Sequence, residues 1–454
     1  MTYRDPVRVP LSGNPWIDGL LDGYRWGTTA KNPAVGFTFI SDTSDKPKGE
    51  FGGYPSWGWS DEERQLMENA MDWIASVSGL KFIDRGDDND DEVEIWFYNL
   101  DRRNSEGSYG FAYTPGSDSD EGLVAINWSA YQNNDGSFKN SIASGSFYGI
   151  TFLHELSHAV GLKHPHDKGL HGEPRFPGLT RKSNEYKDAG EFGQNAHPWT
   201  QLSYVDKGAR NGLVPERIES YGFLQSPGAL DVAALQWMYG TNDQTANGDD
   251  VYLLPLNNQE GIGWQSIWDT GGIDLIDGSG AKRPVSIDLR NATLDLSKAA
   301  GGYVSRVEGV YGGFTIAHDW DGESLEAPTG KVVIENATGG RKGDVLIGNT
   351  ANNRLEGGKG KDILFAGAGR KNRSIGGKGK DQFWIDTGPD SFVKVMDFEA
   401  GKDRLVIDAD PAVDLVLQSR GKHMEIVVED ELVGLLKKAS VDLKDVIFSD
   451  FSTL

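Results

Sequence analysis

Residues 151–164 read TFLHELSHAVGLKH and contain the pattern H-E-x-x-H-x-x-G-x-x-H. His154 and His158 are four residues apart, so on a helix both imidazoles leave the same face, one turn apart. Gly161 permits a turn with positive φ, which ends the helix and brings His164 back as a third ligand. The spacing predicts a zinc site, because an amphipathic helix that is merely rich in histidine does not require Gly161 or His164.

The predicted ligand set also indicates the kind of zinc site. Three neutral imidazoles leave a fourth position open for water, as in catalytic rather than structural sites. Zinc lowers the pKa of such a water toward about 7, and Glu155, next to the first ligand, can take its proton as a general base.

Composition narrows the class of protein. The chain has 454 residues, enough for two or three domains, with a net charge of -23, a pI of about 4.7 and no cysteine. The negative charge argues against nucleic acid as a partner, and the absence of cysteine excludes disulfides and thiol catalysis. The N-terminal residues lack the apolar segment of a signal peptide, and no apolar run approaches the ~20 residues of a membrane helix. We expect a soluble protein without membrane insertion, whose export would use another route.

Hydrophobic periodicity gives the organisation of the chain. Residues 60–78 predict a helix with a Ser60–Glu63 capping box, and residues 228–239 predict a second helix. Strands are predicted at 93–100, 108–113 and 122–128, one of which could be an edge that accepts an extended peptide. The long 165–199 segment either borders a substrate cleft or forms a remote surface loop. We predict an N-terminal arm at 1–15, a zinc-binding domain at 16–240, a linker at 241–260 and a repeat domain at 261–454.

The repeat domain has a nine-residue period between residues 339 and 384, as in GGRKGDVLI from 339 and GGKGKDILF from 357. This is the repeat of parallel β-rolls that bind calcium, in which glycines make the turns and aspartate supplies the charge. A glycine-rich flexible linker would not keep aspartate and an inward-pointing apolar residue in register. The predicted inward residues are Leu346, Leu355, Leu364 and Phe383. The predicted calcium-binding residues, including an earlier acidic turn, are Asp269, Gly271, Asp274, Gly339, Gly340, Asp344, Gly357, Gly358, Gly360, Asp362, Gly376, Gly377, Gly379 and Asp381.

The two edges of the predicted roll differ in charge. Two nine-residue units make one coil, so every second turn stacks on the same edge. Turns ending in Asp344, Asp362 and Asp381 form one edge, for which we predict about two calcium ions. Turns ending in Asn353 and Lys371 form the other edge, for which we predict none. Lys359, Lys361, Lys378 and Lys380 flank the first edge, so repulsion should weaken calcium binding and make it sensitive to salt.

The zinc motif followed by this repeat resembles the serralysin family, secreted bacterial metalloproteases of the metzincin clan. GNPWIDGLL near the start, LDVAALQWMYG, SIWDTGGID and IENATGG extend the resemblance over nearly the whole chain. The resemblance implies an α/β metzincin zinc-protease domain followed by an all-β C-terminal domain, a parallel β-roll within a β-sandwich. It also implies a monomeric, extracellular enzyme with Zn2+ and Ca2+ that acts on protein or peptide substrates. Expected partners are a type I secretion apparatus, which would read a signal like Asp445–Phe448, and a protein protease inhibitor.

The same resemblance assigns roles to individual residues. It implies that His154, His158 and His164 bind zinc, that Glu155 is the base, and that Tyr204 approaches the metal and donates to the oxyanion. The family has a methionine two residues before that tyrosine, where this chain has Leu202. Because leucine and methionine are similar in volume, we expect the floor of the zinc site to be retained.

Two functional hypotheses follow. The first is a secreted zinc endopeptidase in which activated water attacks a peptide carbonyl. The second is a secreted calcium-binding protein whose protease site has decayed and which acts as a binding or inhibitory module. Leu202 and the long 165–199 segment favour the second slightly, whereas the complete His154–Glu155–His158–His164 set favours the first. A β-roll lipase is not supported, because the chain has no G-x-S-x-G motif.

Overall fold

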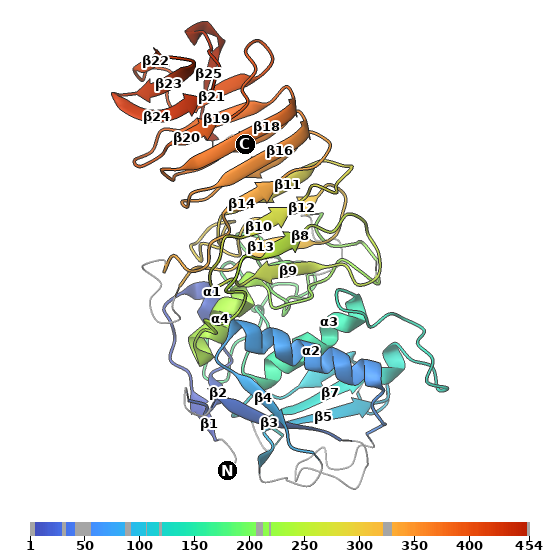
Figure 1. Cartoon of the computed structure of the whole chain (residues 1–454). Helices are drawn as coiled ribbons and strands as arrows, with labels where there is room; N and C mark the ends of the chain where they lie inside the picture. Colours follow the sequence, from blue (N-terminus) through green and yellow to red (C-terminus); the bar gives the residue numbers. More distant parts are fainter. Residues whose placement is uncertain are drawn as a thin grey trace.

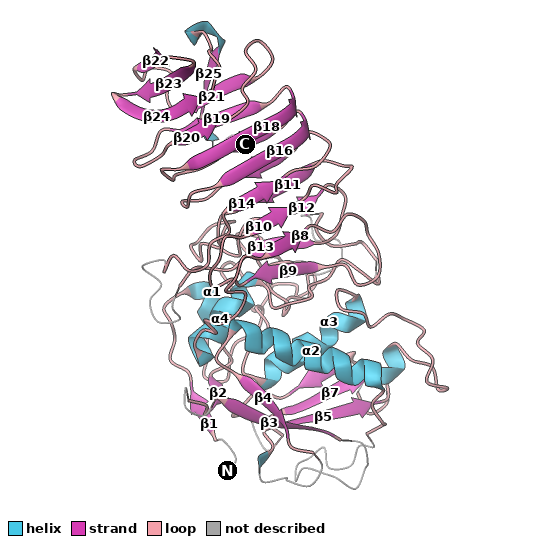
Figure 2. Cartoon of the chain, in the orientation of Figure 1, coloured by secondary structure: helices cyan, strands magenta, loops and turns pink. Residues whose placement is uncertain are grey.

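The computed structural model describes residues 5–29, 33–40, 56–86, 92–105, 107–117, 120–205, 212–217, 219–320 and 329–451. An α/β unit built from the first half of the chain lies at one end, and stacked strands extend from it (Figure 1). Among the described residues, the α-helices lie only in the first of these parts (Figure 2). None of the described helices has both the length and the apolar character needed to cross a bilayer.

The α/β unit is built on a five-stranded sheet in the order β4-β3-β5-β7-β6, in which only β6 runs antiparallel to its neighbour. One face packs against α2 and α3 through residues such as Phe97 and Val124. The elements of this unit are β1 (Pro6–Arg8), α1 (Pro15–Asp18), β2 (Tyr24–Trp26), β3 (Ala34–Phe39), α2 (Asp61–Val77), β4 (Lys81–Asp84), β5 (Ile95–Leu100), β6 (Gly110–Ala112), β7 (Leu123–Asn127), η2 (Trp128–Ala130), α3 (Phe147–Ala159) and α4 (Ala229–Tyr239).

Local sequence signals explain the helices well. The predicted capping box is confirmed: the Ser60 hydroxyl accepts the Glu63 N–H, and the Glu63 carboxylate accepts the Ser60 N–H. The predicted strands 93–100, 108–113 and 122–128 are confirmed as β5, β6 and β7. Strand β6 lies at one edge of the sheet, so no strand among the described residues pairs with its outer side.

In the second half, the chain alternates between two parallel sheets and so winds a β-roll. Strands β15, β17, β19 and β21 stack in one sheet, and β14, β16, β18 and β20 stack in the other. The elements are β8 (Val251–Leu253), β9 (Trp264–Ile267), β10 (Leu275–Asp277), β11 (Val285–Asp288), β12 (Arg306–Val307), β13 (Gly313–Ile316), β14 (Asn336–Thr338), β15 (Val345–Ile347), β16 (Arg354–Gly360), β17 (Ile363–Phe365), β18 (Asn372–Gly379), β19 (Gln382–Asp386), β20 (Val393–Val395), β21 (Arg404–Asp408), β22 (Leu415–Arg420), β23 (His423–Val428), β24 (Glu431–Leu436), η3 (Leu443–Asp445) and β25 (Val446–Ser449).

The inward residues of the roll are those that the repeat predicts. Leu346, Leu355 and Leu364 are fully buried, and Phe383 is nearly so. Two segments differ from expectation. Part of the predicted 241–260 linker forms β8, because Val251–Leu253 pairs in parallel with β10. Residues Pro6–Arg8 of the predicted arm form β1, which pairs with β2.

Candidate metal centres

Helix α3 positions the first two histidines. It begins where the Ser146 hydroxyl accepts the Gly149 N–H, and it carries His154 and His158 on one face. Gly161 then takes a φ of +107°, and a Cβ there would lie 2.3 Å from the carbonyl oxygen of Tyr24. Because only glycine fits this turn, the chain can reverse and bring His164 back over the helix.

The three Nε2 atoms converge on one point. The distances between them are 3.2 Å for His154–His158, 3.1 Å for His154–His164 and 3.1 Å for His158–His164. Nitrogens this close together can all lie about 2.0–2.1 Å from a single zinc ion. The same three residues form a group of side chains that could hold a metal.

The opposite ring nitrogens explain why the Nε2 atoms are available. Nδ1 of His154 lies 2.9 Å from the Gln201 carbonyl oxygen, and Nδ1 of His158 lies 2.7 Å from that of Leu162. Nδ1 of His164 lies 2.8 Å from a carboxylate oxygen of Asp167. These acceptors place the proton on Nδ1 and leave each Nε2 lone pair for a metal. Burial also lowers the pKa of His158 to about 3, which keeps the ring neutral.

Glu155 lies beside the histidines and is buried. Desolvation raises the pKa of its carboxyl to about 8. A Cβ at Gly110 on β6 would fall 2.8 Å from Cγ of Glu155, so this glycine gives the carboxylate its space. A carboxyl with a raised proton affinity beside a metal centre can act as a general base.

A cavity of about 510 Å3 opens in front of this group. Its lining includes His154, Glu155 and Tyr204, together with Tyr186 and His197 from the 165–199 segment. Of the two alternatives for the 165–199 segment, the structure therefore favours a place beside a cavity over a remote surface loop. The Tyr204 ring lies 4.5 Å from the His164 ring and stacks on Tyr186 at 5.6 Å, centroid to centroid. Burial raises the pKa of the Tyr204 hydroxyl, so it remains a proton donor.

The turn beneath the histidines is braced from α4. Leu202 is fully buried in the core. Asp231 accepts hydrogen bonds from the Thr200 hydroxyl (2.6 Å) and the Gln201 N–H (2.8 Å), and the Gln201 carbonyl in turn faces His154. This support by Asp231 was not predicted from the sequence, because it joins segments that are 30 residues apart.

The first edge of the roll forms a ladder of carboxylates. Oδ1 of Asp362 accepts the Asp344 N–H (2.9 Å), and Oδ1 of Asp381 accepts the Asp362 N–H (3.0 Å). Oδ2 of Asp362 is buried without a hydrogen-bond partner. A buried carboxylate oxygen without a hydrogen-bond partner is what a calcium ion would satisfy, so this edge fits the predicted ions.

The ladder is longer than predicted. Oδ1 of Asp403 accepts the Asp381 N–H (3.0 Å), and Asp397 accepts the Gly376 and Gly377 N–H groups. The sequence GKDRLV at 401–406 matches GKDILF at 360–365 and could have revealed this further turn.

The second edge corrects one assignment. Asn372, not Lys371, takes the position equivalent to Asn353, because the extra residue of this repeat is accommodated within the turn before it. Oδ1 of Asn372 accepts the Asn353 N–H (2.7 Å), and its Nδ2 donates to the carbonyls of Gly367 (2.9 Å) and Gly369 (3.0 Å). Nδ2 of Asn353 likewise donates to the Ala351 carbonyl (2.7 Å).

A separate acidic group lies at the start of the roll. Asp269 and Asp274, both predicted, are joined by Asp250, which was not, and the three could hold a metal ion together. Oδ2 of Asp274 is buried without a hydrogen-bond partner, whereas Oδ2 of Asp269 accepts the Tyr252 hydroxyl (2.6 Å). Asp250 could have been found from GDDVYL at 248–253, which has the acid-then-strand pattern of GIDLID at 272–277.

Comparisons with known proteins agree with this architecture. Residues 231–451 match the family described as Peptidase M10 serralysin C terminal. A serralysin from Photorhabdus luminescens is 28% identical over 347 residues, which cover 73% of this chain and 62% of the relative. Metallopeptidase AprA from Pseudomonas marginalis is 28% identical over 333 residues, 70% of this chain and 61% of the relative. The chain therefore spans about three fifths of the length of these relatives.

Proposed function

We propose that this chain, a serralysin-type protein by its C-terminal family match and its relatives, is a secreted zinc endopeptidase. The observation that carries the proposal is the convergence of three histidines beside the buried Glu155, at the wall of an open cavity. The substrates we propose are proteins and peptides, and the cofactors are zinc at the histidines and calcium in the roll.

Each residue of the site has a role in peptide hydrolysis. Zinc held by the three imidazoles would supply Lewis acidity, which polarises the scissile carbonyl and acidifies the attacking water. Glu155 takes the water proton and passes it to the leaving amine, a role that suits its raised pKa. The Tyr204 hydroxyl, which burial keeps protonated, donates a hydrogen bond to the oxyanion.

The outer edge of β6 orients the substrate. An extended peptide that adds to this edge obtains backbone hydrogen bonds that do not depend on its sequence. Gly110 lies on this strand directly beside Glu155, so the added peptide would run past the base. Tyr186 and His197 then limit which side chains fit, so shortening the 165–199 segment should broaden specificity.

We assign export to a one-step pathway that reads the C-terminal part of the chain, where the Asp445–Phe448 motif spans the end of η3 and most of β25. The rival function, a binding or inhibitory module with a decayed site, has less support. Glu155 and the three histidines keep a geometry suited to zinc, and the cavity is open to them.

Replacing the base tests the proposal. Glu155→Ala should lower the kcat/KM for casein at least a hundredfold while about one zinc remains bound per chain, because the ligands are intact. Glu191→Ala, an exposed glutamate of the 165–199 segment, is the matched control and should retain activity. His158→Ala should lose the metal. An inactive wild-type chain that binds zinc would favour the rival function, and a Glu155→Ala variant with a tenth of wild-type activity would exclude Glu155 as the base.

A further inference from the structure

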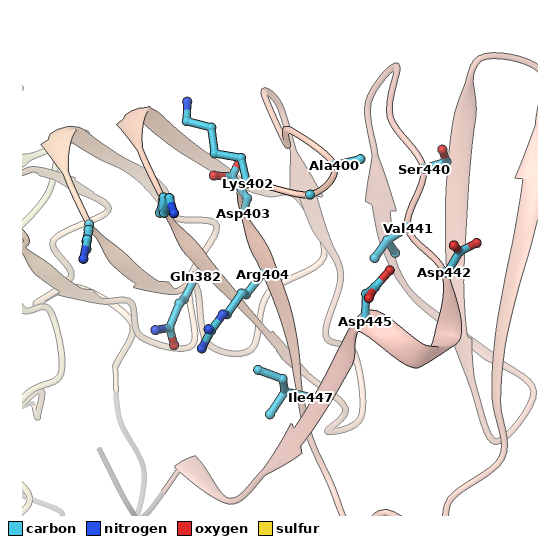
Figure 3. Close-up of a pocket in the computed structure, with 13 residues that line it drawn as sticks. Gln382, Ala400, Lys402, Asp403, Arg404, Ser440, Val441, Asp442, Asp445 and Ile447 are labelled. Carbon is cyan, nitrogen blue, oxygen red and sulfur yellow. The ribbon is translucent and has the colours of Figure 1, made fainter.

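A groove of about 760 Å3 lies beside the last coils of the roll, and we call it the terminal groove. One wall carries Lys361, Lys380 and Arg404, from the coils that lead into β17, β19 and β21. The opposite wall carries Asp442 and Asp445, next to β25. Figure 3 shows Arg404 on one side of the groove and the two aspartates on the other.

The cations of this wall are stacked by the register of the roll. Ile363 pairs with Gln382, and Gln382 pairs with Arg404, so Lys361, Lys380 and Lys402, each two residues earlier, occupy equivalent places on three successive coils, and Arg404 lies two residues beyond Lys402. Successive strands of a sheet are ~4.8 Å apart. The wall therefore presents positive charges in a line, at a spacing set by the backbone rather than by flexible side chains.

The protein offsets only part of this positive charge. Asp403 also lines the wall, where its carboxylate accepts the N–H groups of Asp381 and Glu399. Lys402, in the same wall, pairs with Glu399 at 2.8 Å, but no carboxylate of the described residues forms an ion pair with Lys361, Lys380 or Arg404. Stacking like charges without partners is unfavourable, and it is unexpected in a chain with a net charge of -23. A bound anion with regularly spaced charges would remove the repulsion.

The other surfaces of the groove narrow the chemistry of that anion. Asp442 and Asp445 accept hydrogen bonds but repel anions, so the ligand must carry donors on the side opposite its charges. Val441 and Ile447 provide apolar contact between the walls. Among the lining residues there is no aromatic side chain on which a nucleic-acid base could stack.

We propose that the terminal groove binds an acidic polysaccharide, a chain of uronate sugars. Carboxylates along the chain face the stacked cations of the basic wall, and sugar hydroxyls donate hydrogen bonds to Asp442 and Asp445. The surface would hold the protein on a polyanionic matrix, and this proposal does not depend on the zinc site being active.

Binding of hexamannuronate to the full chain in calcium tests the proposal, by calorimetry, with uncharged mannohexaose and oligothymidylate as comparison probes. The triple variant Lys361→Gln/Lys380→Gln/Arg404→Gln should weaken hexamannuronate binding at least tenfold and flatten its salt dependence. The matched control Lys371→Gln/Arg373→Gln/Lys422→Gln removes the same charge from exposed positions that do not line the groove, and should change binding less than twofold.

The outcomes are distinct. Unchanged thermal unfolding of the triple variant in calcium would show that the loss of binding is local. Equal loss in the triple and control variants, or no binding of hexamannuronate to the wild type at millimolar concentration, would overturn the proposal. Tighter binding of oligothymidylate than of hexamannuronate would also overturn it and identify a nucleic-acid surface instead.

Discussion

Two edges of the same roll are built on equivalent turns but with different side chains. On one edge, Asp362 accepts the Asp344 N–H through a carboxylate oxygen (2.9 Å). On the other, Asn372 accepts the Asn353 N–H through an amide oxygen (2.7 Å). The two side chains thus join one coil to the next in the same way, and they differ only in their second polar atom.

The second polar atom of each side chain decides whether the edge requires a bound cation. Oδ2 of Asp362 is buried without a hydrogen-bond partner, so the negative charge of the ionised carboxylate is not compensated there. Nδ2 of Asn372 instead donates to the Gly367 and Gly369 carbonyls. The amide of Asn372 therefore supplies the acceptor oxygen that an aspartate would provide. Its N–H groups also supply the partial positive charge that a calcium ion would provide. We expect one edge to require a cation and the other to be complete without one.

Among the tests of this comparison, removal of calcium should change the stability of the roll most. An ion at a hundred times its Kd stabilises the folded state by roughly 2.7 kcal/mol, so two ions would contribute roughly 5 kcal/mol. EGTA should therefore lower the midpoint of unfolding of the roll. The fluorescence of the buried Trp384 would be used to monitor this transition. Phenanthroline, which chelates zinc but not calcium, is the control and should not change the midpoint of this transition. If EGTA has no effect, the aspartate edge does not bind calcium.

Disrupting the asparagine edge should have the next largest effect. Asn372→Ala removes two donated hydrogen bonds and leaves the buried Asn353 N–H unpaired, which should cost about 2–3 kcal/mol. The cost should be the same in calcium and in EGTA, measured by urea unfolding. Asn352→Ala, at an exposed neighbouring position, should cost less than about 1 kcal/mol. A cost for Asn372→Ala that disappears in EGTA would mean that this edge also depends on calcium.

Three residues of the aspartate edge were predicted from the sequence, but the continuation of this edge to Asp403 was missed and one residue of the asparagine edge was misplaced. The recurring G-G-x-x-x-D pattern identifies which aspartates stack, so Asp344, Asp362 and Asp381 could be placed by aligning the repeats. The extra residue near 366–375 breaks the count, and whether Lys371 or Asn372 faces the turn depends on how the backbone absorbs it. Counting cannot decide this, because either residue continues the strand pattern.

The zinc site also has some features that the sequence predicts and others that it does not. Its ligands follow from local spacing on α3 and from one glycine, so the sequence predicted their convergence. Most contacts that support them do not follow from spacing, because Asp231 and Tyr186 reach the site from other segments, whereas Asp167 lies only three residues after His164. The edge position of β6 was predicted only as one possibility, since the order of strands in a sheet depends on packing against the helices.

The aspartate edge should also make the stability of the roll depend on pH, which is a smaller effect. Burial raises the pKa of Asp362 to about 7 and that of Asp344 to about 6, from a usual 3.8. The folded roll without calcium therefore binds more protons than the unfolded chain between about pH 4 and 7, and its stability is lost as pH rises through this range. In EGTA, the urea midpoint should rise on acidification from pH 8 to 5. In calcium it should fall instead, because protons compete with the metal, and a midpoint independent of pH in EGTA would contradict the account.

The smallest effect concerns the lysines on the aspartate edge. Lys359 and Lys378 are exposed and in register on β16 and β18, one coil apart, beside the turns that we expect to hold calcium. Their repulsion acts through solvent, where exposed charge interactions are worth about 0–1 kcal/mol. Lys359→Gln/Lys378→Gln should therefore tighten calcium binding by about two- to fivefold at low salt, measured by titration with a calcium indicator. Since a salt concentration of about 1 M reduces the Debye length to about 3 Å, the difference should vanish there. Lys371→Gln, on the edge where the amides stand in for the cation, should change calcium affinity at neither salt concentration. Equal tightening by Lys371→Gln would show that net charge, and not position on the edge, sets the affinity.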